Sequence, residues 1–75
     1  MEIRHPSFSF TMVYAENSVN CKVVMENEFY DVYFDGRWMA AIAHTDEWTW
    51  IQASGVPLPE NIIEEIGARI ESEYK

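Results

Sequence analysis

A thiol close to an imidazole is the most reactive chemistry that this sequence could assemble. Cys21 is the single cysteine, and His5 and His44 are the two histidines. Nucleophilic catalysis requires a base within hydrogen-bond reach of the thiol. The alternation around Cys21 instead turns its side chain toward the interior, where a free cysteine usually packs as a small hydrophobic residue. We therefore predict that Cys21 is structural, and a single cysteine also excludes an intrachain disulfide.

Acidic residues near a histidine, or near one another, are the second candidate for chemistry. His44, Asp46 and Glu47 fall in one short segment, and imidazole and carboxylate groups are common metal ligands. Their spacing matches neither a zinc nor a calcium pattern, and one loop supplies too few ligands. Glu60 and Glu64 are one helical turn apart, but no cleft-forming residues accompany them. We predict no metal, no cofactor and no catalytic residue, and therefore a protein that is not an enzyme.

Aromatic residues could bind a ligand by stacking, and Trp48 and Trp50 are the most obvious pair. Nucleic acid would need a basic groove beside the rings, and only Lys22 and Arg37 are near them in the predicted sheet. The formal net charge is −8, from thirteen acidic and five basic residues, which disfavours nucleic acid and anionic membranes as partners. The acidic residues are spread along the chain, so we interpret them as a solubility feature.

The elements that must position these residues begin with a β-hairpin. Asp35-Gly36 separates two alternating apolar stretches, 29–34 and 37–43. A two-residue Asp-Gly link between such stretches is the strongest short-range hairpin signal, because glycine accepts the positive φ angle of a type I′ turn. The hairpin fixes the register of its strands, and register decides which side chains share a face.

Alternation of apolar and polar residues predicts three further strands, at 7–16, 19–26 and 48–52. Asn17-Ser18 is the expected turn between the first two, because asparagine tolerates a left-handed backbone. With the hairpin strands, this gives five strands joined in sequence by short links. We expect them to form an antiparallel meander.

A helix is predicted over 59–74. Ile62, Ile66 and Ile70 recur at helical spacing, and Pro59 suits the first helical turn. Gly67 lies next to this apolar stripe, and a close approach to the sheet is one reason for a glycine there. We expect residues 1–75 to form a single α+β domain, a five-stranded antiparallel β-meander with one C-terminal α-helix packed on one face.

If every pair of consecutive strands is joined by a tight hairpin turn, the apolar side chains that alternate along the five strands all lie on the same face of the sheet. In that register Cys21 lies between Tyr14 and Phe34, and Val32 faces Met39. The helix is expected to cover this face. The predicted core is Phe8, Phe10, Met12, Tyr14, Cys21, Val23, Met25, Val32, Phe34, Met39, Trp48, Trp50, Ile62, Ile66 and Ile70.

The opposite face is also apolar in the same register, where Phe29 would face Ile42 and Tyr33 would face Trp38. Monomers rarely expose contiguous apolar patches above a few hundred Å², and segment 1–6 is too short to cover this one. Alternatively, the helix covers this face, or the cross-strand aromatic pairs only stabilise the sheet. We predict an interface with a second copy, as a homodimer, or with another protein; the alternative is a small-molecule or sugar site. The predicted interface residues are Phe29, Tyr33, Trp38, Ile42 and Ile51.

The N-terminal residues show no basic segment followed by an apolar one, so a cytoplasmic protein without a signal peptide is expected. Three stretches carry a resemblance: Gly36-Arg-Trp38, 48–52 (Trp-Thr-Trp-Ile-Gln) and 58–62 (Leu-Pro-Glu-Asn-Ile). The chain resembles small uncharacterised bacterial proteins of this length from structure surveys, particularly those of gut Bacteroides. The resemblance implies the meander-plus-helix fold and no activity, so it assigns no functional residue.

Overall fold

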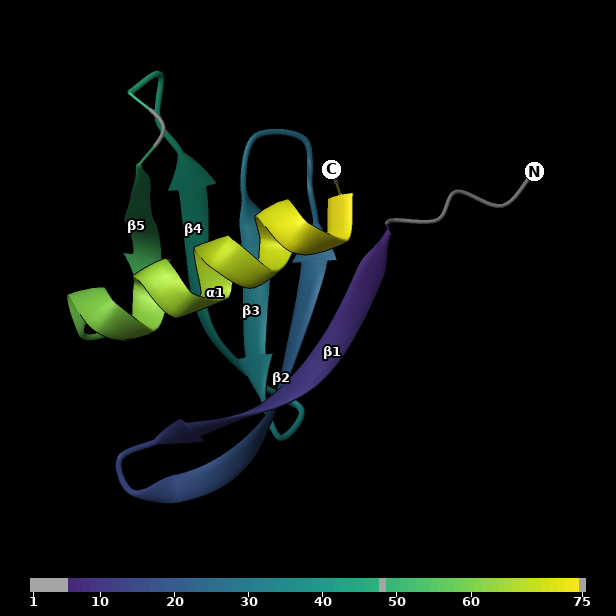
Figure 1. Ribbon diagram of the computed structural model, residues 1–75, viewed down its shortest axis with the longest axis vertical. Helices are drawn as coiled ribbons and strands as arrows, with labels where there is room; N and C mark the ends of the chain where they lie inside the picture. Colours follow the sequence, from purple (N-terminus) through teal and green to yellow (C-terminus); the bar gives the residue numbers. More distant parts are fainter. Residues whose placement is uncertain (1–5, 48, 75) are drawn as a thin grey trace.

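Five strands and one helix follow one another in the computed structural model, which describes residues 6–47 and 49–74. Each strand pairs antiparallel with the next, in the order β1-β2-β3-β4-β5, and the helix lies across one face of the sheet (Figure 1). This arrangement confirms the predicted α+β meander. The elements are β1 (Ser7–Tyr14), β2 (Asn17–Met25), β3 (Tyr30–Phe34), β4 (Arg37–His44), β5 (Trp50–Gly55) and α1 (Glu60–Tyr74).

The Asp-Gly turn joins β3 to β4 as predicted. Asp35 and Gly36 have φ angles of 51° and 85°, and Phe34 pairs with Arg37. Asp35 also ties the hairpin to β2, since its Oδ1 accepts from the Asn20 backbone N–H at 2.9 Å and its own N–H donates to the Asn20 carbonyl at 2.8 Å. The tip of this hairpin is therefore held by a neighbouring strand as well as by its turn.

The register of β1 and β2 differs from the prediction. The turn falls at Ala15-Glu16, with φ angles of 52° and 67°, and not at Asn17-Ser18. Positive φ is unfavourable for residues with a Cβ, so the packing of the strands, and not the preference of the turn residues, sets this register. Tyr14 pairs with Asn17, and the shift from the expected register is even. The predicted side chains therefore still face the helix.

A bulge in β4 overturns part of the predicted arrangement. Val32 pairs with Ala40 and not with Met39, which is the extra residue. Because side chains alternate along a strand, one extra residue turns each later side chain to the other face. Ile42 therefore pairs with Tyr30 and is fully buried on the helix side. The prediction that Ile42 lies on the exposed face is wrong, because the bulge buries this branched side chain where the regular register would have buried a smaller alanine.

β5 is also displaced from its predicted position. Trp50 pairs with His44 and Ile51 with Ala43, followed by a second irregularity opposite Ala41. Trp50 is half-buried and packs against the core, as predicted. The prediction for Trp48 falls outside the described residues.

The core lies between the sheet and α1. Ile62, Ile66 and Ile70 form the predicted helical stripe, and all three are buried. Gly67 lies directly on Trp50, because a Cβ on this glycine would come within 2.3 Å of the indole. The close approach suggested by the sequence is thus confirmed. The buried cluster consists of Met12, Cys21, Val23, Val32, Phe34, Ala40, Ile42, Leu58, Ile62, Ile63, Ile66 and Ile70.

Candidate functional site

The face of the sheet opposite α1 is the candidate site. No other element of the described chain covers it (Figure 1). Two of its large apolar residues are well exposed, Trp38 at 43% and Ile51 at 51%. We call this surface the open face. The strand pairing assigns to it Lys22, Val24, Asp31, Tyr33, Trp38, Ala41, Ala43 and Ile51.

A hydrogen bond orients the central aromatic residue of the open face. The Trp38 indole Nε1–H donates to Asp31 Oδ1 at 3.0 Å. Trp38 pairs with Tyr33, whereas Asp31 pairs with Ala41 further along the same strands, so the indole extends along the sheet. Ala41 is only 2% exposed although it lies on the open face. The Asp31 carboxylate, on a largely apolar surface, thus has a hydrogen-bond partner within the same chain.

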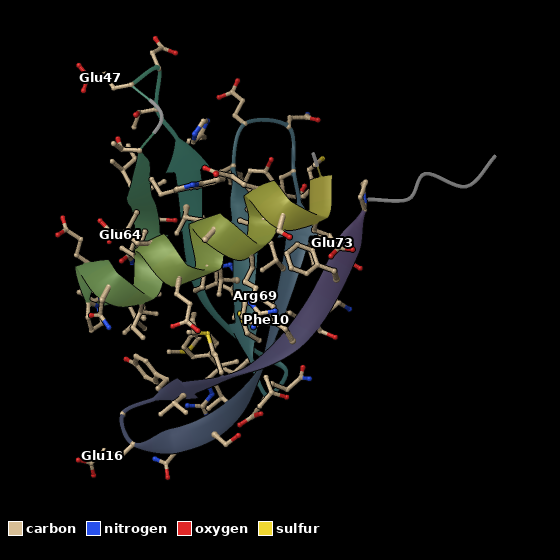
Figure 2. All side chains as sticks on the ribbon, in the orientation of Figure 1. Phe10, Glu16, Glu47, Glu64, Arg69 and Glu73 are labelled. Carbon is tan, nitrogen blue, oxygen red and sulfur yellow. The ribbon has the colours of Figure 1, made fainter. Side chains whose placement is uncertain are left out.

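The charges of the protein are distributed unequally between its two sides. The open face carries one base and one acid, Lys22 and Asp31. α1 carries five glutamates and one arginine, a net charge of −4. Figure 2 shows Glu64 and Glu73 toward opposite ends of α1, with Arg69 between them beside Phe10. The open face is therefore close to neutral on a chain whose formal charge is −8.

The structure places the predicted interface residues in three different environments. Tyr33, Trp38 and Ile51 lie on the open face, whereas Ile42 lies beneath the helix. Phe29 precedes β3 and is half-buried in the loop, with its carbonyl accepting from the Glu26 N–H at 2.9 Å. Sequence reasoning missed Ala41 and Ala43, because only the bulge brings them to this side.

A shallow depression lies at one side of the open face. Its volume is about 380 Å³, and Asn20, Lys22, Val24, Tyr33 and Gly36 line it. An aromatic ring, an amide and an ammonium group meet there. Such a set offers one stacking surface and several hydrogen-bond donors, which suits a small polar ligand.

Cys21, the first candidate for catalysis, lies in the core, and His5, one of the two histidines considered with it, falls outside the described residues. Cys21 is fully buried, and burial, followed by the negative charge of Glu65, raises the pKa of its thiol to about 12. The thiolate needed for nucleophilic attack is therefore disfavoured at neutral pH. Among residues 6–47 and 49–74, no three His, Cys, Asp or Glu side chains gather as a metal site.

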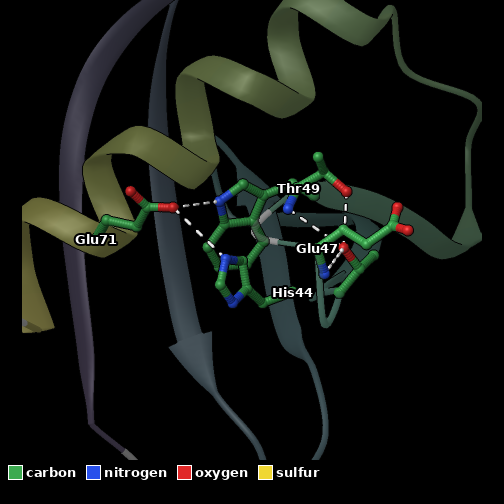
Figure 3. A network of polar contacts seen from close by, with 6 residues as sticks. His44, Glu47, Thr49 and Glu71 are labelled. Carbon is green, nitrogen blue, oxygen red and sulfur yellow. Dashed lines mark hydrogen bonds and ion pairs between the residues drawn. The ribbon is translucent and has the colours of Figure 1, made fainter.

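His44 belongs instead to a polar network between the sheet and the helix (Figure 3). The Trp50 indole Nε1–H donates to Glu71 Oε2 at 3.0 Å, and His44 Nε2 lies 3.7 Å from the same oxygen. The rings of His44 and Trp50 are in contact, with centroids 4.8 Å apart. Next to them, the hydroxyls of Thr45 and Thr49 are 2.7 Å apart and close the β4–β5 loop. The network fastens α1 to β5, and the sequence offered no signal that pairs Glu71 with Trp50.

Comparison of the chain with protein-family models, curated proteins and solved structures gives no match. The resemblance to Bacteroides-type proteins therefore stays a prediction. No helix within the described residues is long and apolar enough to cross a membrane.

Proposed function

We propose that this protein is a small non-enzymatic interaction module that self-associates through the open face of its sheet. The observation that carries the proposal is the exposure of Trp38 and Ile51, at 43% and 51%, on a sheet face that no described element covers. Large aromatic and branched side chains gain most from leaving water. Two copies related by a two-fold axis would bury both faces at once, sheet against sheet.

Charge favours this face over the helix side. Two copies that met through α1 would bring together two surfaces of net charge −4 each. Two open faces, each with one base and one acid, Lys22 and Asp31, bring no net charge into the contact. The indole of Trp38 is already oriented by Asp31, so little side-chain freedom is lost when it is covered.

Light scattering over a wide concentration range tests the proposal. The mass of the natural protein should rise from that of the 8.8 kDa monomer toward twice that value. Trp38→Glu should remain monomeric with an unchanged circular dichroism spectrum, because it places a charge in the centre of the contact. Ile51→Glu, at the other exposed apolar position, should act in the same way.

Val56→Glu is the matched control. Val56 is 46% exposed, but it lies in the connector after β5, outside the open face. This variant should dimerise normally. A natural protein that is monomeric at every concentration, or a Trp38→Glu protein that still dimerises, would contradict the proposal.

A small-molecule or sugar site in the depression beside Tyr33 is the second candidate function. The amide of Asn20 and the ammonium of Lys22 beside an aromatic ring favour it. Fluorescence titration of the monomeric Trp38→Glu protein with simple sugars separates the two candidates. Saturable binding that is lost in Tyr33→Ala would support the ligand site, whereas no response would leave self-association as the function of this face.

A further inference from the structure

The outer edge of β5 is an unpaired sheet edge. β5 is the last strand of the sheet, and within residues 6–47 and 49–74 no strand lies beyond it. The Thr45 N–H donates to the Thr49 carbonyl at 2.8 Å, and Ile51 is paired with Ala43. Because hydrogen bonding alternates along an antiparallel pair, Trp50 and Gln52 turn their backbone N–H and C=O groups away from β4. This edge therefore presents backbone donors and acceptors to a further strand.

A groove runs beside this edge, between β5 and α1, from Glu60 to Glu71 of the helix. Its volume is about 460 Å³. Trp50 contributes an aromatic surface that cannot easily move, because Glu71 accepts its N–H at 3.0 Å and Gly67 lies against its ring. The groove is thus formed before any ligand arrives. It is lined by Thr49, Trp50, Ile51, Glu60, Glu64, Ala68 and Glu71.

The wall that α1 contributes is negatively charged. Glu60 and Glu64 are exposed on successive helical turns, and neither makes an ion pair with a base in the described part of the chain. The single arginine of the helix, Arg69, is engaged elsewhere, with its guanidinium 4.8 Å from the centroid of the Phe10 ring (Figure 2). The groove therefore combines an open backbone edge with uncompensated carboxylates.

We infer that β5 takes up an extended, basic segment of a partner protein as a sixth strand. The backbone of the segment bonds to Trp50 and Gln52, as in other cases of strand addition to a sheet edge. Every second side chain of an added strand points toward α1. Lysine or arginine at these positions meets Glu60 and Glu64, and small apolar residues at the positions between them lie beside Ile51.

The charge of the groove selects this occupant over a second copy of the chain. Two β5 edges paired with each other would bring two sets of groove glutamates together with no basic residue between them. Like charges placed opposite each other across strands are destabilising. This surface shares Ile51 with the margin of the open face, but the outward edge of β5 and the glutamates of α1 lie outside that face. The proposed strand addition therefore does not rest on self-association, and a monomeric protein is used to test it.

A synthetic peptide tests the inference, with the blocked sequence Lys-Val-Lys-Val-Lys-Val-Lys as the probe. Its binding to the monomeric Trp38→Glu protein is followed by backbone amide NMR. We expect saturable shifts centred on Trp50, Gln52 and the start of α1. A peptide with glutamate in place of lysine should not bind, and a peptide with a central proline should bind more weakly, because proline removes a backbone donor.

Two double variants give the matched comparison. Glu60→Gln/Glu64→Gln should weaken binding by about fivefold or more at low salt, given the usual strength of exposed ion pairs. Glu65→Gln/Glu73→Gln removes the same charge from α1 outside the groove and should bind nearly as well as the parent. Equal binding of the lysine and glutamate peptides, shifts away from β5, or no binding would overturn the inference. If no peptide binds, the role of Glu60 and Glu64 is instead to prevent other strands from pairing with this sheet edge.

Discussion

Both tryptophans that the structure describes give their indole N–H to a carboxylate. Trp38 donates to Asp31 and Trp50 to Glu71, each at 3.0 Å. Such bonds to an ionised acceptor are stronger than neutral ones and leave the ring faces free for apolar contact. The first pair orients an exposed ring on the open face. The second fastens α1 to β5 and shapes the acidic groove.

Cys21 shows at the scale of one residue how burial changes ionisation. Its folded pKa is about 12, against a reference value of 9.0. Between these values the unfolded chain has lost the thiol proton and the folded chain has kept it. The folded state therefore binds more protons, and the free energy of unfolding should fall as the pH rises from about 9 toward 12. Below pH 9 this contribution is fully present.

Denaturant titrations at a series of alkaline pH values measure this effect. Other groups also titrate there, so Cys21→Ala is the control, and its stability should fall less steeply over the same range. Parallel slopes for the two proteins would contradict the predicted difference in protonation.

At the scale of elements, the close contact between α1 and β5 depends on the absence of a side chain at Gly67. A Cβ at position 67 would come within 2.3 Å of the Trp50 indole, which Glu71 holds in place. Gly67→Ala gains about 1 kcal/mol in helix propensity, but overpacking of this kind costs about 1–3 kcal/mol. We expect a lower free energy of unfolding and a changed tryptophan emission spectrum.

Ser72→Ala provides the comparison for Gly67→Ala. Ser72 is exposed on the same helix, so this change alters propensity without a new contact. It should leave the emission spectrum unchanged. A Gly67→Ala protein more stable than the parent would show that Trp50 moves aside at little cost.

Alternation and turn chemistry predicted the elements well because both are local. The Asp35-Gly36 turn and the pairing of Cys21 with Phe34 are confirmed. The turn between β1 and β2 lies at a different position from the one predicted, but the register shift is an even number of residues. Each side chain of these strands therefore lies on the predicted face of the sheet. The bulge at Met39 could not be predicted, because no local signal marks an extra residue whose benefit is the burial of Ile42 beneath a helix that comes later in the chain.

The same limit applies to the residues of the candidate site. Tyr33, Trp38 and Ile51 lie on the predicted face of the sheet, whereas Ile42 does not, and Ala41 and Ala43 were missed.

At the scale of the whole molecule, the charged side chains of α1 and the exposed apolar side chains of the open face lie on opposite sides of the sheet. Most of the negative charge of α1 lies opposite a nearly neutral sheet face. Each copy nevertheless carries a formal charge of −8, so two copies repel at long range. Screening lengths fall from about 10 Å at 0.1 M salt to about 3 Å at 1 M.

Salt should therefore affect the two surfaces in opposite directions. Sodium chloride is expected to strengthen self-association through the open face by weakening this repulsion, and to weaken peptide binding at β5 by screening attraction. Sedimentation equilibrium and peptide titration, each at low and high salt, measure the two effects. A dimer that dissociates as salt is added would indicate that ion pairs, and not apolar burial, hold it together.

The strict order of the meander also bears on how the chain acquires its structure. Every sheet neighbour is a sequence neighbour, so each hairpin closes over a short loop. Short closures carry a small entropic cost and favour rapid folding. The sheet is able to form strand by strand as the chain is synthesised, and α1, which follows all five strands in the sequence, completes the core. Until α1 packs, the apolar side of the sheet that it covers is exposed to solvent.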